Sequence, residues 1–220
     1  MSTAIPAQRV SRTLALILVV ALMSGCAPGA MDLIHAAADG DTKTVSELLG
    51  RGVDVNASGG ATGMTALMAA AANDRLETAR LLIQKGAAIN QEAPQRVTAL
   101  FCAEHAGAAD VTALLLEAGA DANTPAPGGG TVLMDAASGG RLEIARLLIQ
   151  KGADVNAARE SRLTALMFAA GKGNVDSVAL LLRSGADAAA RDLSGRTAAD
   201  HARERHHPAL AELLSRPGRN

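Results

Sequence analysis

The chain has one cluster of histidines, and imidazole rings could bind a metal ion or transfer protons. His201, His206 and His207 lie near the C-terminal end, with Glu204 between them. A zinc site needs three or four ligands that converge on one point, and on a helix these spacings do not bring the three rings to one face. We interpret the cluster as a solvated C-terminal cap and expect no metal site. A metal-binding or enzymatic protein that uses these histidines is the alternative.

The sequence offers no other arrangement typical of catalysis or cofactor binding. No serine lies in the Gly-x-Ser-x-Gly turn of serine hydrolases. The glycine run 128–130 is not followed by the Lys-Thr pair of a phosphate-binding loop, so it indicates a flexible loop tip. We therefore expect no cofactor and no enzymatic activity.

The N-terminal segment has the pattern of a secretory signal. Arg9 and Arg12 precede an apolar run at 14–23, which is about half of the roughly 20 residues that a membrane-spanning helix needs. A basic region followed by a short apolar core predicts a signal peptide. A cytoplasmic protein whose N-terminus only mimics such a signal is an alternative.

The end of that segment, Leu-Met-Ser-Gly-Cys at 22–26, resembles the cleavage box of bacterial lipoproteins. The resemblance implies a signal peptide at 1–25, lipidation of Cys26 and a short tether at 26–30. It also implies a lipid anchor in the periplasm, on the outer membrane, because Ala27 rather than Asp follows the cysteine. An ordinary signal peptide with an incidental cysteine is the alternative. Cys102 is then the one unmodified thiol, and we expect it to be a small core residue.

The composition excludes a nucleic-acid partner. The chain has 21 basic and 22 acidic residues, no tryptophan or tyrosine, and only two phenylalanines. Neither a strong positive field nor a set of aromatic stacking platforms is available.

Threonines recur every 33 residues and set the architecture. They are Thr65, Thr98, Thr131, Thr164 and Thr197, and each begins an apolar helical phrase such as Thr-Ala-Leu-Met. Glycines follow the second apolar segment with the same step, at 86, 119, 152 and 185. Threonine caps helix starts and glycine ends helices at positive φ. A fixed period of this length predicts a stack of helix-turn-helix units.

This period and these phrases resemble ankyrin-repeat proteins. The resemblance covers residues 31–214 in about six repeats, with Met31 in the first threonine slot and a C-terminal tail at 215–220. It implies an all-α repeat solenoid of stacked helix-turn-helix ankyrin repeats with hairpin-like loops. The chain departs from the family in its Thr-Pro-Leu-His phrase, because no unit has the proline or the histidine.

The resemblance also implies the function. We expect a non-enzymatic protein–protein interaction scaffold that binds a protein partner on its concave face and stabilises or inhibits a periplasmic enzyme. The positions expected at the concave face and loop tips are Gln95, Arg96, His105, Arg159, Glu160, Arg162, Lys172 and Arg191. Their mostly positive charge favours an acidic protein partner. Membrane contact is expected through the lipid anchor only.

Overall fold

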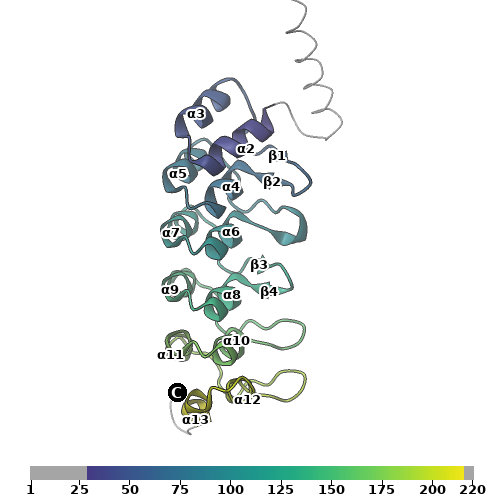
Figure 1. The fold of residues 1–220 in the computed structure, drawn as a ribbon, viewed down its shortest axis with the longest axis vertical. Helices are drawn as coiled ribbons and strands as arrows, with labels where there is room; N and C mark the ends of the chain where they lie inside the picture. The colour runs from purple at the N-terminus through teal and green to yellow at the C-terminus, as the bar shows by residue number, and fades with distance from the viewer. Residues whose placement is uncertain (1–28, 216–220) are drawn as a thin grey trace, which may run out of the picture.

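A computed structural model describes residues 29–215 as one elongated stack of helix pairs (Figure 1). The expected signal peptide, Cys26 and most of the C-terminal tail lie outside the described residues. The first helices of the six pairs are α2 (Ala30–Asp39), α4 (Ala66–Ala72), α6 (Ala99–Ala106), α8 (Val132–Gly139), α10 (Ala165–Lys172) and α12 (Ala198–Glu204). The second helices are α3 (Thr42–Gly50), α5 (Leu76–Gln84), α7 (Ala109–Glu117), α9 (Leu142–Gln150), α11 (Val175–Arg183) and α13 (Pro208–Ser215). The predicted all-α repeat solenoid is confirmed.

Loops project from the same side of every pair (Figure 1). Two of them are short antiparallel hairpins, β1 (Ser58–Gly59) with β2 (Met64–Thr65) and β3 (Pro125–Ala126) with β4 (Gly130–Thr131). The loop before α6 instead contains a 3-10 turn, η1 (Pro94–Arg96). Single bridges, Ala93 with Val97 and Ala158 with Thr164, close the loops before α6 and α10.

The recurring threonines begin the first helices as predicted. Each of the five is extended, and its hydroxyl accepts a hydrogen bond from the backbone N–H three residues later, at 3.2–3.4 Å. Such a cap contributes about 1 kcal/mol. At Thr197 the side chain of Asp200 also accepts from the threonine N–H, which completes a capping box.

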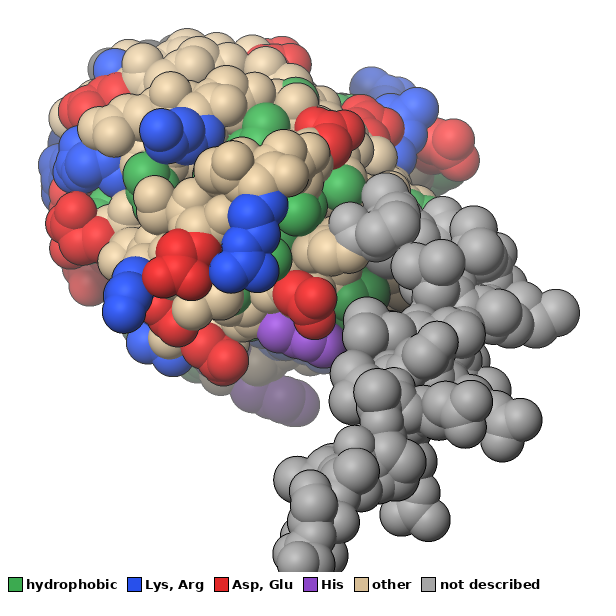
Figure 2. Space-filling model, turned by 90° about the horizontal axis from the view of Figure 1, so that it is seen from above, with side chains coloured by type: hydrophobic (Ala, Val, Ile, Leu, Met, Phe, Trp, Pro, Cys, Tyr) green, Lys and Arg blue, Asp and Glu red, His purple; other side chains and the backbone are tan. Residues whose placement is uncertain are grey.

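The first unit begins differently because Met31 has no side-chain oxygen to cap a helix. Helix α2 starts at Ala30, and the capping residue is Gly29, with φ of 81° and no side-chain hydrogen bond. The buried register nevertheless matches the other units, with Leu33 in the place of Leu67. Viewed along the stack onto this end of the molecule, positive and negative side chains alternate with small apolar areas (Figure 2). This mixed surface is what a terminal unit needs where it meets water.

The core runs the length of the stack and has the same period as the sequence. One leucine of each internal first helix and one of the facing second helix are buried, with at most 1% of the side chain exposed. They are Leu67, Leu100, Leu133 and Leu166, and Leu82, Leu115, Leu148 and Leu181. Burial of each leucine contributes roughly 1.5–3 kcal/mol relative to exposure. Buried alanine pairs such as Ala136 and Ala137 let neighbouring first helices pack closely.

A ladder of asparagines connects consecutive units. The Oδ1 of Asn123 accepts from the N–H of Asp154 at 2.7 Å, and its Nδ2 donates to the Gly152 carbonyl at 3.1 Å. The same pair of bonds recurs at Asn56, Asn90 and Asn156. Each asparagine thereby satisfies backbone groups of the next unit at the end of its second helix. The ladder fixes the spacing of the loops.

Within residues 29–215, no helix combines the length and hydropathy that a bilayer crossing requires.

Candidate partner-binding surface

The predicted partner-binding residues lie on what we call the inner surface. It comprises the exposed side of the first helices α4, α6, α8, α10 and α12 with the loops that precede them. His105 and Lys172 are exposed in the last turns of α6 and α10. The other six, Gln95, Arg96, Arg159, Glu160, Arg162 and Arg191, lie in loops.

Gln95 and Arg96 are separated along the stack from the other predicted loop residues. Both are exposed and have positive φ, 64° and 63°, in the turn that precedes α6. The Ala93 N–H donates to the Val97 carbonyl at 2.8 Å and closes this turn. The β3–β4 hairpin of the next unit lies between this turn and the loop that carries Arg159 (Figure 1). The structure therefore does not bring all eight predicted residues together.

Arg159 connects two loops to an aromatic side chain. Its guanidinium donates to the Gly128 carbonyl in the glycine-rich hairpin of the preceding unit. Its guanidinium carbon lies 5.7 Å from the centre of the Phe168 ring. A contact of this kind contributes about 0.5–1 kcal/mol at an exposed site. The glycine-rich tip at 128–130, which was predicted to be flexible, is therefore hydrogen-bonded to the loop of the next unit.

An ion pair connects α6 to the residue that precedes α9. The Glu104 side chain is fully buried, and its Oε1 accepts from Nη1 of Arg141 at 2.7 Å. Nη2 of the same arginine donates to the His105 carbonyl at 3.0 Å, while the His105 ring stacks on Phe101 with 5.8 Å between ring centres. These contacts fix the position of His105 on α6.

The second oxygen of Glu104, Oε2, has no hydrogen-bond partner among the described residues. Burial raises the pKa of this carboxyl to about 7, although the nearby positive charge of Arg141 opposes the shift. Burial also raises the pKa of Asp135, against the opposing charges of Arg159, His105 and Arg141. Two carboxyl groups with raised pKa values thus lie among the cations of the inner surface.

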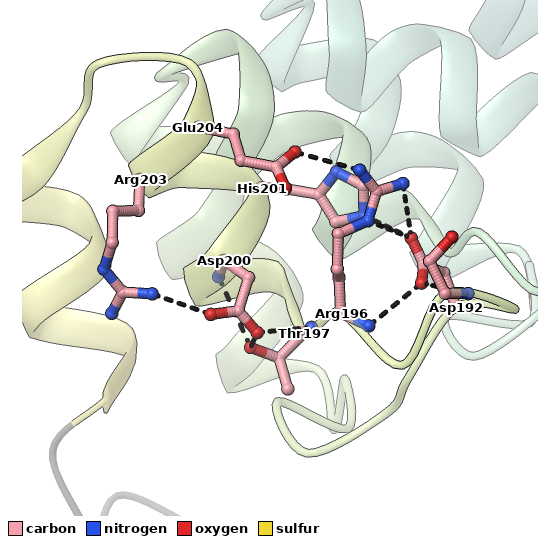
Figure 3. A network of polar contacts seen from close by, with 8 residues as sticks. Asp192, Arg196, Thr197, Asp200, His201, Arg203 and Glu204 are labelled. Atoms are coloured by element: carbon pink, nitrogen blue, oxygen red, sulfur yellow. Dashed lines mark hydrogen bonds and ion pairs between the residues drawn. The ribbon is translucent and has the colours of Figure 1, made fainter.

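A second polar network fixes the last unit, around the buried Asp192 (Figure 3). Its Oδ1 accepts from the backbone N–H groups of Ser194 and Arg196 at 2.8 and 3.0 Å. Its Oδ2 accepts from the Arg196 side chain at 2.9–3.0 Å and contacts Nε2 of His201 at 2.9 Å. Arg196 also pairs with Glu204 at 3.0 Å. Burial alone would raise the pKa of Asp192, but these hydrogen bonds outweigh it and lower the pKa to about 2.

This network corrects the interpretation of the histidine cluster as a solvated cap. The His201 side chain is only 15% exposed and belongs to the Asp192 network. His206 is exposed with φ of 64°, and the His207 ring lies over Gly173. The three rings therefore have separate environments. Within residues 29–215, no three histidine, cysteine, aspartate or glutamate side chains are grouped closely enough to hold a metal ion.

The inner surface is hollowed at two places near the C-terminal end. One hollow, of 380 Å³, lies between successive loops and is lined by Arg162, Arg191 and Asp187 among others. The second is a groove of 420 Å³ across α8, α10 and α12, and Lys172 is one of its lining residues. Three of the predicted residues therefore line a concave feature.

Cys102 lies in the core as expected, with 8% of its surface exposed. Burial raises the pKa of its thiol to about 11. The thiol is therefore protonated at neutral pH and a poor nucleophile.

Sequence reasoning missed the residues that hold the inner surface in place. Arg141 had a signal, because Arg75 takes the same place 66 residues earlier and donates to the Ala38 carbonyl as Arg141 does to the His105 carbonyl. Glu104, Asp192 and Arg196 have no residue of the same type at the matching places of the other units. The asparagine ladder could have been predicted from the sequence, because each of the four asparagines follows a unit's glycine by four residues. They are at 56, 90, 123 and 156.

Comparison with known proteins identifies the fold family. The family described as ankyrin repeats (3 copies) matches in overlapping segments at 15–93, 33–126, 91–159 and 133–220. No curated protein sequence matches the chain.

Two solved structures are similar to the chain. One comes from the complex of a predatory endopeptidase with an immunity protein from Bdellovibrio bacteriovorus. It has a TM-score of 0.78 and 32% identity, over 84% of this chain and 97% of that chain. The other is an ankyrin repeat domain from Acinetobacter baumannii, with a TM-score of 0.75 and 34% identity, over 83% of this chain and 95% of that chain. The chain belongs to the ankyrin-repeat family.

Proposed function

We propose that this protein is a non-enzymatic binding protein that inhibits an endopeptidase through its inner surface. The observation that carries the proposal is the similarity to a chain from the complex of an endopeptidase with an immunity protein, at 32% identity over 97% of that chain. The similarity extends over 84% of this chain, which is too large a share to leave out the loops and first helices that form the inner surface.

The rigidity of the inner surface supports a binding role. The Gly128 carbonyl of the preceding unit holds Arg159, and the carboxylates of Asp192 and Glu204 hold Arg196. Side chains that are already ordered lose less conformational entropy when a partner binds. A surface with two phenylalanines and no tryptophan or tyrosine can bind tightly by this means.

We further propose that the protein acts in the periplasm, anchored through lipidated Cys26. The support is the N-terminal sequence pattern described above. Two or more acyl chains are needed for a stable anchor, since one chain alone binds a membrane marginally. Membrane fractionation of the Cys26→Ser variant tests this part. We expect the protein to move from the membrane fraction to a soluble fraction, and an unchanged membrane fraction would contradict the anchor.

Capture and inhibition from a periplasmic extract of the producing organism test the binding role. We expect the immobilised protein to retain an endopeptidase and to lower the endopeptidase activity of the extract. Reversal of three inner-surface charges, Arg159→Glu, Arg162→Glu and Lys172→Glu, should weaken both effects at least tenfold, because mutual attraction becomes repulsion.

The control variant carries Lys85→Glu and Lys151→Glu, which reverse exposed charges at the ends of the second helices α5 and α9. It should retain and inhibit the enzyme as the native protein does. An extract that loses no endopeptidase activity, and from which no endopeptidase is retained, would exclude the proposed inhibitor function.

A further inference from the structure

The groove across α8, α10 and α12 has an apolar floor. Leu163, Met167 and Phe168 line it, and Met167 is only 2% exposed while the other two are half-buried. Arg159 covers one face of the Phe168 ring. The volume of 420 Å³ is at the small end of the range for ligand pockets. It is large enough for one or two side chains and too small for a helix.

Cations surround this floor. Lys172, Arg196 and Arg205 line the groove with a single carboxylate, Glu204. Arg196 is already paired with Asp192 and Glu204, at 2.9 and 3.0 Å. Lys172 and Arg205 are exposed and have no ion-pair partner among residues 29–215. Two cations are therefore available to carboxylates from another molecule.

One wall of the groove contains a glycine, which has no side chain. Gly171 lies within α10 and lines the groove. A Cβ atom there would lie 3.8 Å from both Arg205 Cγ and His201 Cβ, which is ordinary van der Waals contact. Neither crowding nor an unusual φ requires glycine at this position. Gly171 is the second-last residue of α10, and its lack of a side chain leaves this part of the groove free of side-chain atoms.

We propose that this groove is the specificity pocket of the inner surface. It takes one large apolar side chain, flanked by aspartate or glutamate, from an exposed loop of the partner. The apolar side chain contacts the floor, and the flanking carboxylates pair with Lys172 and Arg205. This assignment rests on the proposed binding function and specifies the chemistry of the segment that is bound.

The test is an array of nonapeptides with Leu, Ile, Met, Phe or Trp at the centre, flanked either by Asp and Glu or by Asn and Gln. The best acidic peptide is then titrated into the 15N-labelled protein. We expect amide shifts confined to residues 163–172 and 196–205, and at least tenfold weaker binding by the matched amide peptide. No binding by any acidic peptide, equal binding by both classes, or shifts elsewhere on the stack would overturn the assignment.

Two variants probe the groove in opposite ways. Gly171→Leu fills it, whereas Lys172→Glu with Arg205→Glu reverses its charge. Both should weaken binding of the acidic peptide at least tenfold. The matched controls are Gly50→Leu, at the end of α3 where an added Cβ meets no atom within 4 Å, and Lys151→Glu. Neither control should change peptide binding, and equal losses in the controls would contradict the assignment.

The same variants separate this inference from the proposed function. If an endopeptidase is inhibited equally by the native protein and by Gly171→Leu, the inhibitor function stands and the groove assignment is wrong. If acidic peptides bind in the groove while no endopeptidase is retained or inhibited, the groove assignment stands and the inhibitor function is wrong.

Discussion

Two buried carboxylates of the stack have opposite electrostatic environments. Asp192 receives hydrogen bonds from two backbone N–H groups, the Arg196 guanidinium and His201, and its pKa falls to about 2. Glu104 is paired with Arg141 alone, and burial raises its pKa to about 7. Burial favours the neutral acid unless hydrogen bonds to the charged form outweigh it. The number of donors around each oxygen therefore decides which carboxylate ionises easily.

Glu104→Gln should change the pH dependence of stability. The folded-state pKa of about 7 lies above the ordinary value of 4.5, so the folded state binds the proton more tightly than the unfolded state does. Stability contributed by this group is present below about pH 4.5 and is lost as the pH rises through 7. Each pKa unit corresponds to about 1.4 kcal/mol, so Glu104 lowers the free energy of unfolding above pH 7 by an amount on the order of 3 kcal/mol relative to pH 4.

Urea unfolding of both proteins between pH 4 and pH 8.5 measures this effect. As the pH rises across that range, the free energy of unfolding of the native protein should fall relative to that of Glu104→Gln, by an amount on the order of 3 kcal/mol. Gln cannot titrate, so any fixed cost of its buried amide group shifts the whole curve by a constant. A stability difference that does not vary with pH would show that Glu104 has an ordinary pKa.

At the scale of the elements, the sequence predicts where the helices begin and end, because interactions within a few residues decide these positions. A threonine hydroxyl caps a helix start three residues away, and a glycine such as Gly119, with φ of 95°, ends a helix within the same unit. Both signals recur with the period of the fold, so helix positions could be predicted. The start of α2 was less predictable, because Met31 occupies the slot without the capping oxygen.

The contacts between elements could not be predicted in the same way. Arg141 and Glu104 are 37 residues apart, and Arg159 reaches Gly128 across 31 residues. The 33-residue period places Glu104 in the slot of the buried Ala71, Ala137 and Ala170, so its burial could have been predicted. Its pairing with Arg141 could not, because that contact depends on how consecutive units stack. Predicted surface positions such as Lys172 were easier to place, since the helix period alone puts them opposite the core.

The whole molecule is a row of similar units, and several of the features that do not repeat lie on the inner surface. The leucine core and the asparagine ladder repeat from unit to unit. The polar networks of Glu104 and Asp192, the Arg159–Phe168 contact and the groove occur once each among the described residues. The repeated features stabilise the stack, and the unrepeated ones can distinguish one partner from another. We therefore expect partner contacts in the C-terminal half of the inner surface.

Hydrogen–deuterium exchange of the protein, alone and with an endopeptidase captured in the proposed pull-down, tests this central claim most directly. We predict slower exchange in the complex at residues 158–172 and 191–205, with no change in the second helices α9 and α11. Slower exchange confined to those second helices, or none on the inner surface, would contradict the account.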